Sequence, residues 1–287
     1  MTPAPSIVVV GSINMDLVTT TATFPSPGET LLGHGFSTRP GGKGANQAIA
    51  AARAGGRVAL LGAVGTDGFG AGLRRSLTDE GVDDTCLRTV DGPSGTASIT
   101  VDDAGENSIV VVPAANSRFT GLTEADLEAL RGADVLLCQL EIPTETVVQA
   151  ARAAHDRGVT VMLNPSPVRA LPDALVENVD VLVANRHEAA LADERIPHLV
   201  TTLGADGARY AGASGGFSVA APRVQAVDST GAGDAFAGAF AVAWAGGADP
   251  STALRRGTAA GALTATRRGA GAAAPTRAEI DALVPAR

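Results

Sequence analysis

The chain has 287 residues, which is long enough for one large α/β domain, and with 45 % hydrophobic and 18 % charged residues it is too apolar to be disordered. Its net charge of −8 and its aromatic content of 3 % argue against nucleic acid and anionic membranes as partners. Two cysteines are too few for a disulfide scaffold, and residues 1–6 contain no apolar leader, so we expect a cytoplasmic protein.

Apolar, largely β-branched runs alternate along the chain with Ala-rich stretches typical of helices. The runs lack the polar–apolar alternation of half-exposed strands, so they predict strands buried on both faces. Such strands belong to a mostly parallel, doubly wound sheet in a three-layer α/β/α fold. The predicted strands are residues 7–10, 57–64, 134–140, 159–163, 180–184 and 199–203, and the main predicted helices are 45–54, 123–131, 144–157, 232–245, 250–266 and 276–283.

Two segments interrupt this alternation. They contain strand-like pieces and a hairpin signal, at about residues 17–22, 31–37, 96–101 and 108–112. We expect residues 15–40 and 94–113 to form a small antiparallel sheet inserted in a single domain that spans residues 1–287. Such a sheet would act as a lid that excludes water from a site at the carboxyl edge of the main sheet.

The strongest local motif is the Gly-rich turn from Asp228 to Asp234, which leads into the apolar helix predicted at 232–245. A helix N-terminus presents free backbone N–H groups and the positive end of the helix dipole, so we expect an anion there. Asp234 would repel a bound phosphate, which leaves two interpretations open. It either accepts a proton from an attacking hydroxyl group or simply caps the helix.

A second Gly-rich segment, 41–47, opens the helix predicted at 45–54 and contains Lys43, the only lysine of the chain. It lacks the P-loop pattern, but its glycines allow a ligand to approach the backbone, and Lys43 and Asn46 offer donors. Because all other basic residues are arginines, position 43 is expected to need the compact ammonium group of lysine.

Further polar residues follow predicted strands, where open α/β sheets bind their ligands. Asn14 and Asp16 follow the first strand and suit sugar hydroxyls, although ordinary turn chemistry explains them equally well. Glu141 is placed in the same way after the strand at 134–140. Asn185 and Glu188 lie one helical turn apart, a spacing that can hold hydrated Mg²⁺ near phosphates.

Taken in order, these motifs resemble the PfkB family of sugar kinases, and within it the ribokinases. The resemblance implies a ribokinase-like fold and the ATP-dependent phosphorylation of a primary sugar hydroxyl, which in ribose is O5. It extends from residue 7 to about residue 283 and rests on residues 11–16, 27–30, 41–47, 62–70, 139–141, 163–165, 185–188, 202–207 and 228–236.

The resemblance also implies a role for each matching residue. Asp234 is implied as the general base, and the backbone N–H groups that form the anion hole are implied to be those of Gly231, Ala232 and Gly233. The implied sugar contacts are Asn14, Asp16, Gly42, Lys43, Asn46, Glu141 and Asp234. The implied nucleotide contacts are Asn185, Thr202, Gly204, Gly207, Gly233 and Thr258.

Cofactors and a partner follow from the same resemblance. Asn185 and Glu188 would hold Mg²⁺ through water. Lid sheets of such kinases commonly pair, so a homodimer through the lid is implied. A monovalent cation, K⁺, would be bound largely through backbone oxygens at Asp228, Thr230, Thr264, Arg267, Gly269 and Ala273.

Two departures from the family pattern stand out. Residues 189–197 are too few for the further helix usual at this point, so we expect one face of the sheet to be less covered. Ala273 replaces a small polar residue, so we expect a lower affinity for the cation. The alternatives left open are a 2-deoxyribose or nucleoside kinase of the same family, and a sugar- or nucleotide-binding member without catalysis.

Overall fold

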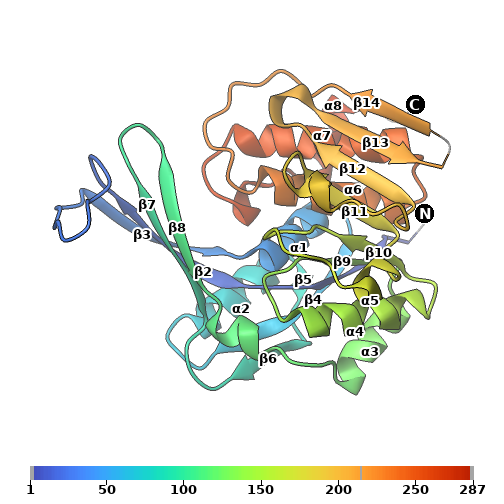
Figure 1. The fold of residues 1–287 in the computed structure, drawn as a ribbon, viewed down its shortest axis with the longest axis horizontal. Helices are drawn as coiled ribbons and strands as arrows, with labels where there is room; N and C mark the ends of the chain where they lie inside the picture. Colours follow the sequence, from blue (N-terminus) through green and yellow to red (C-terminus); the bar gives the residue numbers. More distant parts are fainter. Residues whose placement is uncertain (1–2, 214, 285–287) are drawn as a thin grey trace.

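The computed structural model describes residues 3–213 and 215–284, whose strands form one large and one small sheet (Figure 1). The pairings within the large sheet are parallel except at its β12–β13–β14 edge. Its spatial order is β14 (Gly215–Val219), β13 (Ala208–Gly212), β12 (His198–Thr202), β11 (Val181–Asn185), β10 (Thr160–Leu163), β9 (Val135–Cys138), β1 (Ser6–Val10), β4 (Arg57–Gly65) and β5 (Val82–Asp83), with β6 (Leu87–Val90) paired to β4.

Both faces of the large sheet are covered, as the unalternating apolar runs predict. In β1, Ile7 and Val9 enter one core while Val8 and Val10 enter the other. Cys138 at the end of β9 is a buried free thiol, and burial raises its pKa to about 12. One face carries α1 (Lys43–Arg53), α2 (Gly70–Thr78), α6 (Ala232–Ala245), α7 (Pro250–Ala265) and α8 (Arg277–Leu283), and the other carries α3 (Glu124–Arg131), α4 (Thr144–His155) and α5 (Asp173–Val176).

The small sheet projects from the main body at the left of Figure 1. Its outer pairings are antiparallel, and its central pairing, between β2 and β7, is parallel. Its order is β3 (Gly35–Gly41), β2 (Asn14–Thr20), β7 (Gly95–Val101) and β8 (Asn107–Val112). The predicted position of β3, 31–37, is wrong: the strand is Gly35–Gly41. Leu32 is 95 % exposed, and the pairing of Asn14 with Gly41 sets the register of the strand.

Short 3₁₀ helices join several of these elements: η1 (Ala114–Arg118), η2 (Glu188–Leu191), η3 (Gly204–Asp206) and η4 (Gly271–Ala273). Between β11 and β12 the chain forms only η2, and Leu199 of β12 is half-buried, as expected from the short connection. Within residues 3–213 and 215–284, no helix combines the length and the apolar character that a membrane span requires.

The position of α6 decides where the site can form. Ten successive residues of α6, Asp234–Ala243, are buried, because the helix packs against both α1 and α7. A Cβ atom at Gly238 would lie 2.7 Å from the backbone nitrogen of Ala51 on α1, so only glycine allows the two helices to approach this closely. One turn earlier, this approach brings Asp234 within hydrogen-bonding distance of Gln47.

Candidate active site

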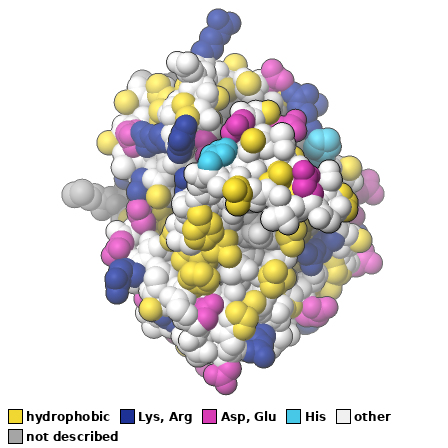
Figure 2. Space-filling model, turned by 90° about the vertical axis from the view of Figure 1, so that its left-hand side faces the viewer, with side chains coloured by type: hydrophobic (Ala, Val, Ile, Leu, Met, Phe, Trp, Pro, Cys, Tyr) yellow, Lys and Arg dark blue, Asp and Glu magenta, His cyan; other side chains and the backbone are white. Residues whose placement is uncertain are grey.

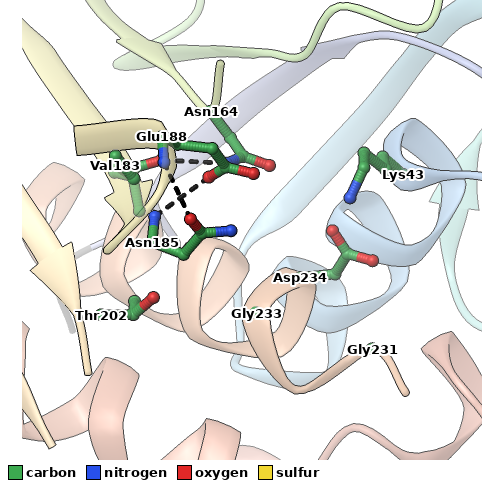
Figure 3. A pocket seen from close by; sticks show the side chains of 10 residues that line it. Lys43, Asn164, Val183, Asn185, Glu188, Thr202, Gly231, Gly233 and Asp234 are labelled. Atoms are coloured by element: carbon green, nitrogen blue, oxygen red, sulfur yellow. Dashed lines mark hydrogen bonds between the residues drawn. The ribbon is translucent and has the colours of Figure 1, made fainter. Parts of the chain in front are cut away.

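Two adjoining cavities lie where β11 and β12 end and α6 begins. The smaller, of about 140 Å³, contains the side chain of Asp234 and is lined by polar residues (Figure 3). The larger, of about 630 Å³, shares Thr202 and Gly233 with the smaller one. The smaller cavity is lined by Lys43, Asn164, Val183, Ala184, Asn185, Glu188, Thr202, Gly231, Gly233 and Asp234.

Asp234 lies inside the molecule with a fixed carboxylate. Its side chain is 8 % exposed, its Oδ2 accepts a hydrogen bond from Asn46 Nδ2 at 3.1 Å, and its Oδ1 accepts one from Gln47 Nε2 at 2.9 Å. Burial raises the pKa of Asp234, although the charge of Lys43 and these two hydrogen bonds oppose the rise. The N-cap residue of α6 is Gly231, and no side chain forms a capping hydrogen bond at this end of the helix. Asp234 is therefore not a helix cap.

The turn before α6 depends on Gly231. This residue has φ 74° and is the N-cap, and a Cβ atom there would lie 2.7 Å from Ala270 Cα. Glycine is therefore required both for the left-handed backbone and for the close packing of the 267–273 loop. Gly231 and Gly233 line the smaller cavity, whereas the Ala232 N–H donates to the Ser229 carbonyl oxygen at 3.2 Å. Ala232 would have to release that hydrogen bond to contact an anion.

The expected sugar contacts meet between the small sheet and α1. A Cβ atom at Gly41 would lie 2.2 Å from Asp16 Oδ2, so the Asp16 carboxylate lies against the turn before Lys43. Glu141 Oε2 accepts hydrogen bonds from Ser12 Oγ at 2.5 Å and from the Lys43 backbone N–H at 3.1 Å. Burial raises the pKa of Asp16 to about 6, with a further contribution from Glu141.

The structure thus brings Asn14, Asp16, Gly42, Lys43, Asn46, Glu141 and Asp234 to one region, although only Lys43 and Asp234 line the smaller cavity. Asn14 is 3 % exposed, and its Oδ1 accepts a hydrogen bond from Asn116 Nδ2 at 2.7 Å. Because this oxygen already accepts from Asn116, the group that Asn14 can best offer to a ligand is its amide nitrogen, as a donor.

The larger cavity collects most of the expected nucleotide contacts. It is lined mainly by small and apolar side chains, among them Phe236 of α6, and residues of α7 form part of its wall. Thr258 donates its hydroxyl to the Leu254 carbonyl oxygen at 2.7 Å, so it contributes space and a methyl group to this cavity. The expected residues in its lining are Thr202, Gly204, Gly207, Gly233 and Thr258, and Asn185 lies in the smaller cavity instead.

Asn185 and Glu188 form a compact pair at the end of β11. Asn185 Oδ1 accepts the backbone N–H groups of His187 and Glu188, both at 2.9 Å, while Glu188 Oε2 accepts the backbone N–H of Asn185 at 3.0 Å. These bonds leave the Asn185 amide nitrogen and the second Glu188 oxygen. A carboxylate oxygen suits the hydrogen atoms of a metal-bound water, and an amide nitrogen suits a phosphate oxygen, so the pair fits a hydrated Mg²⁺ beside phosphates.

The residues expected around K⁺ lie behind the first turn of α6 and outside the linings of the two cavities. Asp228 joins the two loops, since its carboxylate accepts the Thr230 N–H at 2.9 Å and the Gly269 N–H at 3.1 Å. Burial acts to raise the pKa of Asp228, but these hydrogen bonds outweigh it and the pKa is lowered.

The fit of this region to K⁺ is partial. The Thr264 hydroxyl is engaged by the Ala260 carbonyl oxygen at 2.8 Å, and the Ala273 carbonyl oxygen accepts from Arg267 Nη1 at 3.5 Å. A cation bound here would compete with Arg267 for the Ala273 carbonyl oxygen, whereas the Thr264 hydroxyl oxygen keeps its lone pairs when it donates.

Sequence reasoning missed several amide side chains of the site. Asn116 holds Asn14, Gln47 holds Asp234, and Asn164 Nδ2 donates to Glu188 Oε2 at 3.3 Å. Asparagine and glutamine are common in turns and on surfaces, so their types alone carry no signal. One signal in the sequence could have indicated two of these side chains. Gln47 lies in the segment of Lys43, and Gln139 lies in the segment of Glu141.

Comparisons with known proteins agree with this geometry. The chain matches the model of the pfkB family carbohydrate kinases over residues 4–277. It is 40 % identical, over 291 residues, to a ribokinase of Bacillus subtilis, covering 97 % of this chain and 99 % of the relative. It is also 33 % identical, over 293 residues, to a deoxyribokinase of Salmonella typhi, covering 94 % of this chain and 95 % of the relative.

Among solved structures, the Arabidopsis thaliana ribokinase complexed with ribose and ATP superposes with a TM-score of 0.92. The two proteins are 31 % identical, and the superposition covers 99 % of this chain and 100 % of the plant enzyme. The same fold therefore surrounds a ribose and a nucleotide in that protein.

Proposed function

The chain belongs to the pfkB family of carbohydrate kinases, and we propose that within this family it is a ribokinase, which transfers the terminal phosphoryl group of ATP to O5 of D-ribose. The observation that carries the proposal is the place of Asp234. Its buried carboxylate lies at the N-terminus of α6, between the region of the expected sugar contacts and the larger cavity. A base at this point meets the acceptor hydroxyl and the phosphoryl group together.

Asp234 is the general base in this proposal. Its raised pKa strengthens it as a proton acceptor, while the hydrogen bonds from Asn46 and Gln47 keep its two oxygens in a fixed orientation. Lys43 lies on the same side of the smaller cavity and supplies positive charge beside it (Figure 3). The proton leaves the sugar hydroxyl as its oxygen attacks phosphorus.

The backbone at the start of α6 receives the transferred group. The N–H groups of Gly231 and Gly233, with that of Ala232 once it leaves Ser229, point their positive charge to one place. The packing of the turn holds Gly231 in place, so of the three donors Ala232 is the one that must change its hydrogen bond to receive charge on the phosphoryl oxygens. Phosphoryl transfer requires positioning and charge neutralisation more than covalent help.

The sugar is held by Asn14, Asp16, Gly42, Lys43, Asn46 and Glu141, and the nucleotide by the larger cavity. Asn185 and Glu188 would hold Mg²⁺ through water, and the ion would supply positive charge to the phosphate oxygens. Backbone oxygens of the loops that Asp228 joins would hold K⁺. Its contribution is to stiffen these loops behind Gly231.

We also propose that the small sheet is the lid and that two copies of the chain associate through it in the cytoplasm. β8 is an edge strand whose residues Ile109–Val112 are all exposed, and Phe36 of β3 is 69 % exposed. Figure 2, which shows the side where the small sheet projects, displays hydrophobic side chains gathered on this face. A second copy offers the same uncharged strand and unpaired backbone edge, so the two can cover each other.

The test is a substrate panel with ATP and Mg²⁺, in which ADP release is measured directly by chromatography. D-ribose is expected to give the highest kcat/KM, with product phosphorylated at O5. 2-Deoxyribose is the second candidate, because one relative at 33 % identity is a deoxyribokinase. A clear preference for 2-deoxyribose or for a nucleoside would replace ribose in the proposal, and no ADP release with any acceptor would refute catalysis.

Asp234→Asn tests the base directly. The amide keeps the size of the side chain but cannot accept the proton, so kcat should fall about 10²- to 10⁴-fold while ribose still binds. Calorimetric titration with ribose in the absence of nucleotide measures the retained binding. A variant that keeps near-normal turnover would remove Asp234 from this role.

A further inference from the structure

Gln47 is a fully buried amide whose two N–H groups serve different parts of the site. Its Nε2 donates to Asp234 Oδ1 at 2.9 Å and to Asn164 Oδ1 at 3.2 Å. Asn164 in turn donates to Glu188 Oε2 at 3.3 Å and to the Val183 carbonyl oxygen at 2.9 Å. One side chain of α1 therefore joins the carboxylate of α6 to the carboxylate at the end of β11.

The orientation of the Gln47 amide is set by a second buried glutamine. Gln139, which follows β9, is fully buried, and its Nε2 donates to Gln47 Oε1 at 2.5 Å. With this donor in place the oxygen of Gln47 must face Gln139, so its nitrogen must face Asp234 and Asn164. The reverse orientation would place the Gln47 oxygen against the oxygens of both neighbours.

Gln139 keeps this orientation although one of its own atoms finds no partner. Within the described part of the chain, Gln139 Oε1 is a buried oxygen without a hydrogen bond. It lies against the Gly11 backbone, where an added Cβ atom would be 2.1 Å away. A buried unpaired oxygen is unfavourable, so the hydrogen bond to Gln47 offsets that cost, and the two glutamines fix each other's orientation.

We propose that Gln47, oriented by Gln139, is a positioning residue that fixes the Asp234 carboxylate and keeps it in register with Asn164 and Glu188. The inference rests on the proposed role of Asp234 as the base. Because both N–H groups of Gln47 are committed, a shift of β11 is transmitted through Asn164 to the carboxylate that receives the proton. The base and the residues beside the phosphates are thereby held at one distance from each other.

Loss of Gln47 should affect Asp234 in two ways. The carboxylate loses one of its two side-chain donors and can rotate, and it loses a hydrogen bond that favours its charged form. The other charged groups that act on it, Lys43 of α1, Glu141 after β9 and Asp16 of β2, are unchanged. The acidic limb of the pH–kcat profile should therefore move to higher pH.

The experiment compares Gln47→Met, Gln139→Met and the double variant, since methionine keeps the length of the side chain without a donor. Gln47→Met should lower kcat about tenfold to a hundredfold, with the ribose dissociation constant changed less than about threefold. Gln139→Met, whose side chain makes no hydrogen bond to Asp234, should lower kcat less and shift the acidic limb in the same direction. Gln149→Met, on the exposed face of α4, is the matched control and should leave kcat and the pH profile unchanged.

The double variant decides whether Gln139 acts through Gln47. With Met at position 47 there is no amide to orient, so adding Gln139→Met should change kcat by less than about twofold. Independent multiplication of the two effects, or an unshifted acidic limb in both single variants, would overturn the inference. If Gln47→Met does not fold, the acidic limb of Gln139→Met alone decides the question. Activity retained by Asp234→Asn would instead refute the proposed base, whatever the glutamine variants do.

Discussion

Sugar binding should weaken as the solution is acidified, because a charged Asp16 carboxylate accepts hydrogen bonds from sugar hydroxyls much more strongly than the neutral acid does. Burial and the nearby Glu141 raise the pKa of Asp16 from 3.8 to about 6. At pH 8 nearly all of the Asp16 carboxyl groups are ionised, about half are at pH 6, and about one in eleven is at pH 5. The dissociation constant for ribose should therefore rise about twofold at pH 6 and about tenfold at pH 5.

Calorimetric titration of ribose without nucleotide is the appropriate assay, because binding without transfer does not require Asp234 to act as a base. Binding near pH 6 should release protons, because ribose favours the ionised form of Asp16. The release is measured as a dependence of the binding enthalpy on the ionisation enthalpy of the buffer. Asp16→Asn should bind ribose more weakly and without the pH dependence. A dissociation constant that is flat between pH 8 and pH 5, or that keeps its pH dependence in Asp16→Asn, would refute this account.

The same raised pKa predicts the sign of an effect on stability. The folded protein holds a proton on Asp16 at pH values where the unfolded chain, with a pKa of 3.8, has lost it. The contribution of Asp16 to the free energy of unfolding is therefore largest below pH 4 and declines as the pH rises through about 6. Asp16 should lower the melting temperature at pH 7 relative to that at pH 5. In Asp16→Asn this contribution is absent, so the melting temperature at pH 7 should rise relative to that at pH 5.

Three further variants test other parts of the structure. Gly231→Ala should lower the free energy of unfolding by about 1–3 kcal/mol and reduce kcat, because φ of Gly231 is 74° and the new Cβ atom would meet Ala270. Gly233→Ala is the control: the space around its Cβ atom is open, so thermal stability should be unchanged. Lys43→Arg should raise the KM for sugar several-fold with little change in melting temperature, because the planar guanidinium is bulkier at this close backbone approach, and unchanged kinetic constants would contradict that. Val110→Lys, at a position 63 % exposed on β8, should yield monomers in light scattering after gel filtration, and a persisting dimer would place the interface elsewhere.

Much of the main sheet could be predicted from the sequence because its strands are apolar on both faces. β1, β4 and β10 coincide with their predicted runs to within about one residue at each end. β5 was missed because it has two residues, and β6 was missed because its sequence Leu-Arg-Thr-Val is not an apolar run and only Leu87 of it is buried. β3 was displaced because Leu32 is apolar yet exposed and Leu31 is only half-buried, so pairing with β2 and not burial defines that strand.

The sequence indicated many residues of the site, but not the contacts between them. Asn46 and Asp234 are 188 residues apart in the chain, and only the contact between α1 and α6 joins them. The role of Gln47 depends on which of its amide atoms faces Asp234, and that is fixed by Asp234 itself, by Asn164 and by Gln139, which is 92 residues away. No local pattern contains such information, whereas the Gly-rich turn at Gly231 is a local feature and was found from the sequence.

The short step from β1 to β2 has a consequence for the order of events in a reaction cycle. β1 ends at Val10 in the large sheet, and β2 begins at Asn14 in the centre of the small one. Any movement of the small sheet relative to the large one would therefore move Asn14 and Asp16, whereas Asp234 would keep its position on α6. A hinge movement of the small sheet would therefore withdraw two of the six proposed sugar contacts at the same moment, which would favour release of the phosphorylated product.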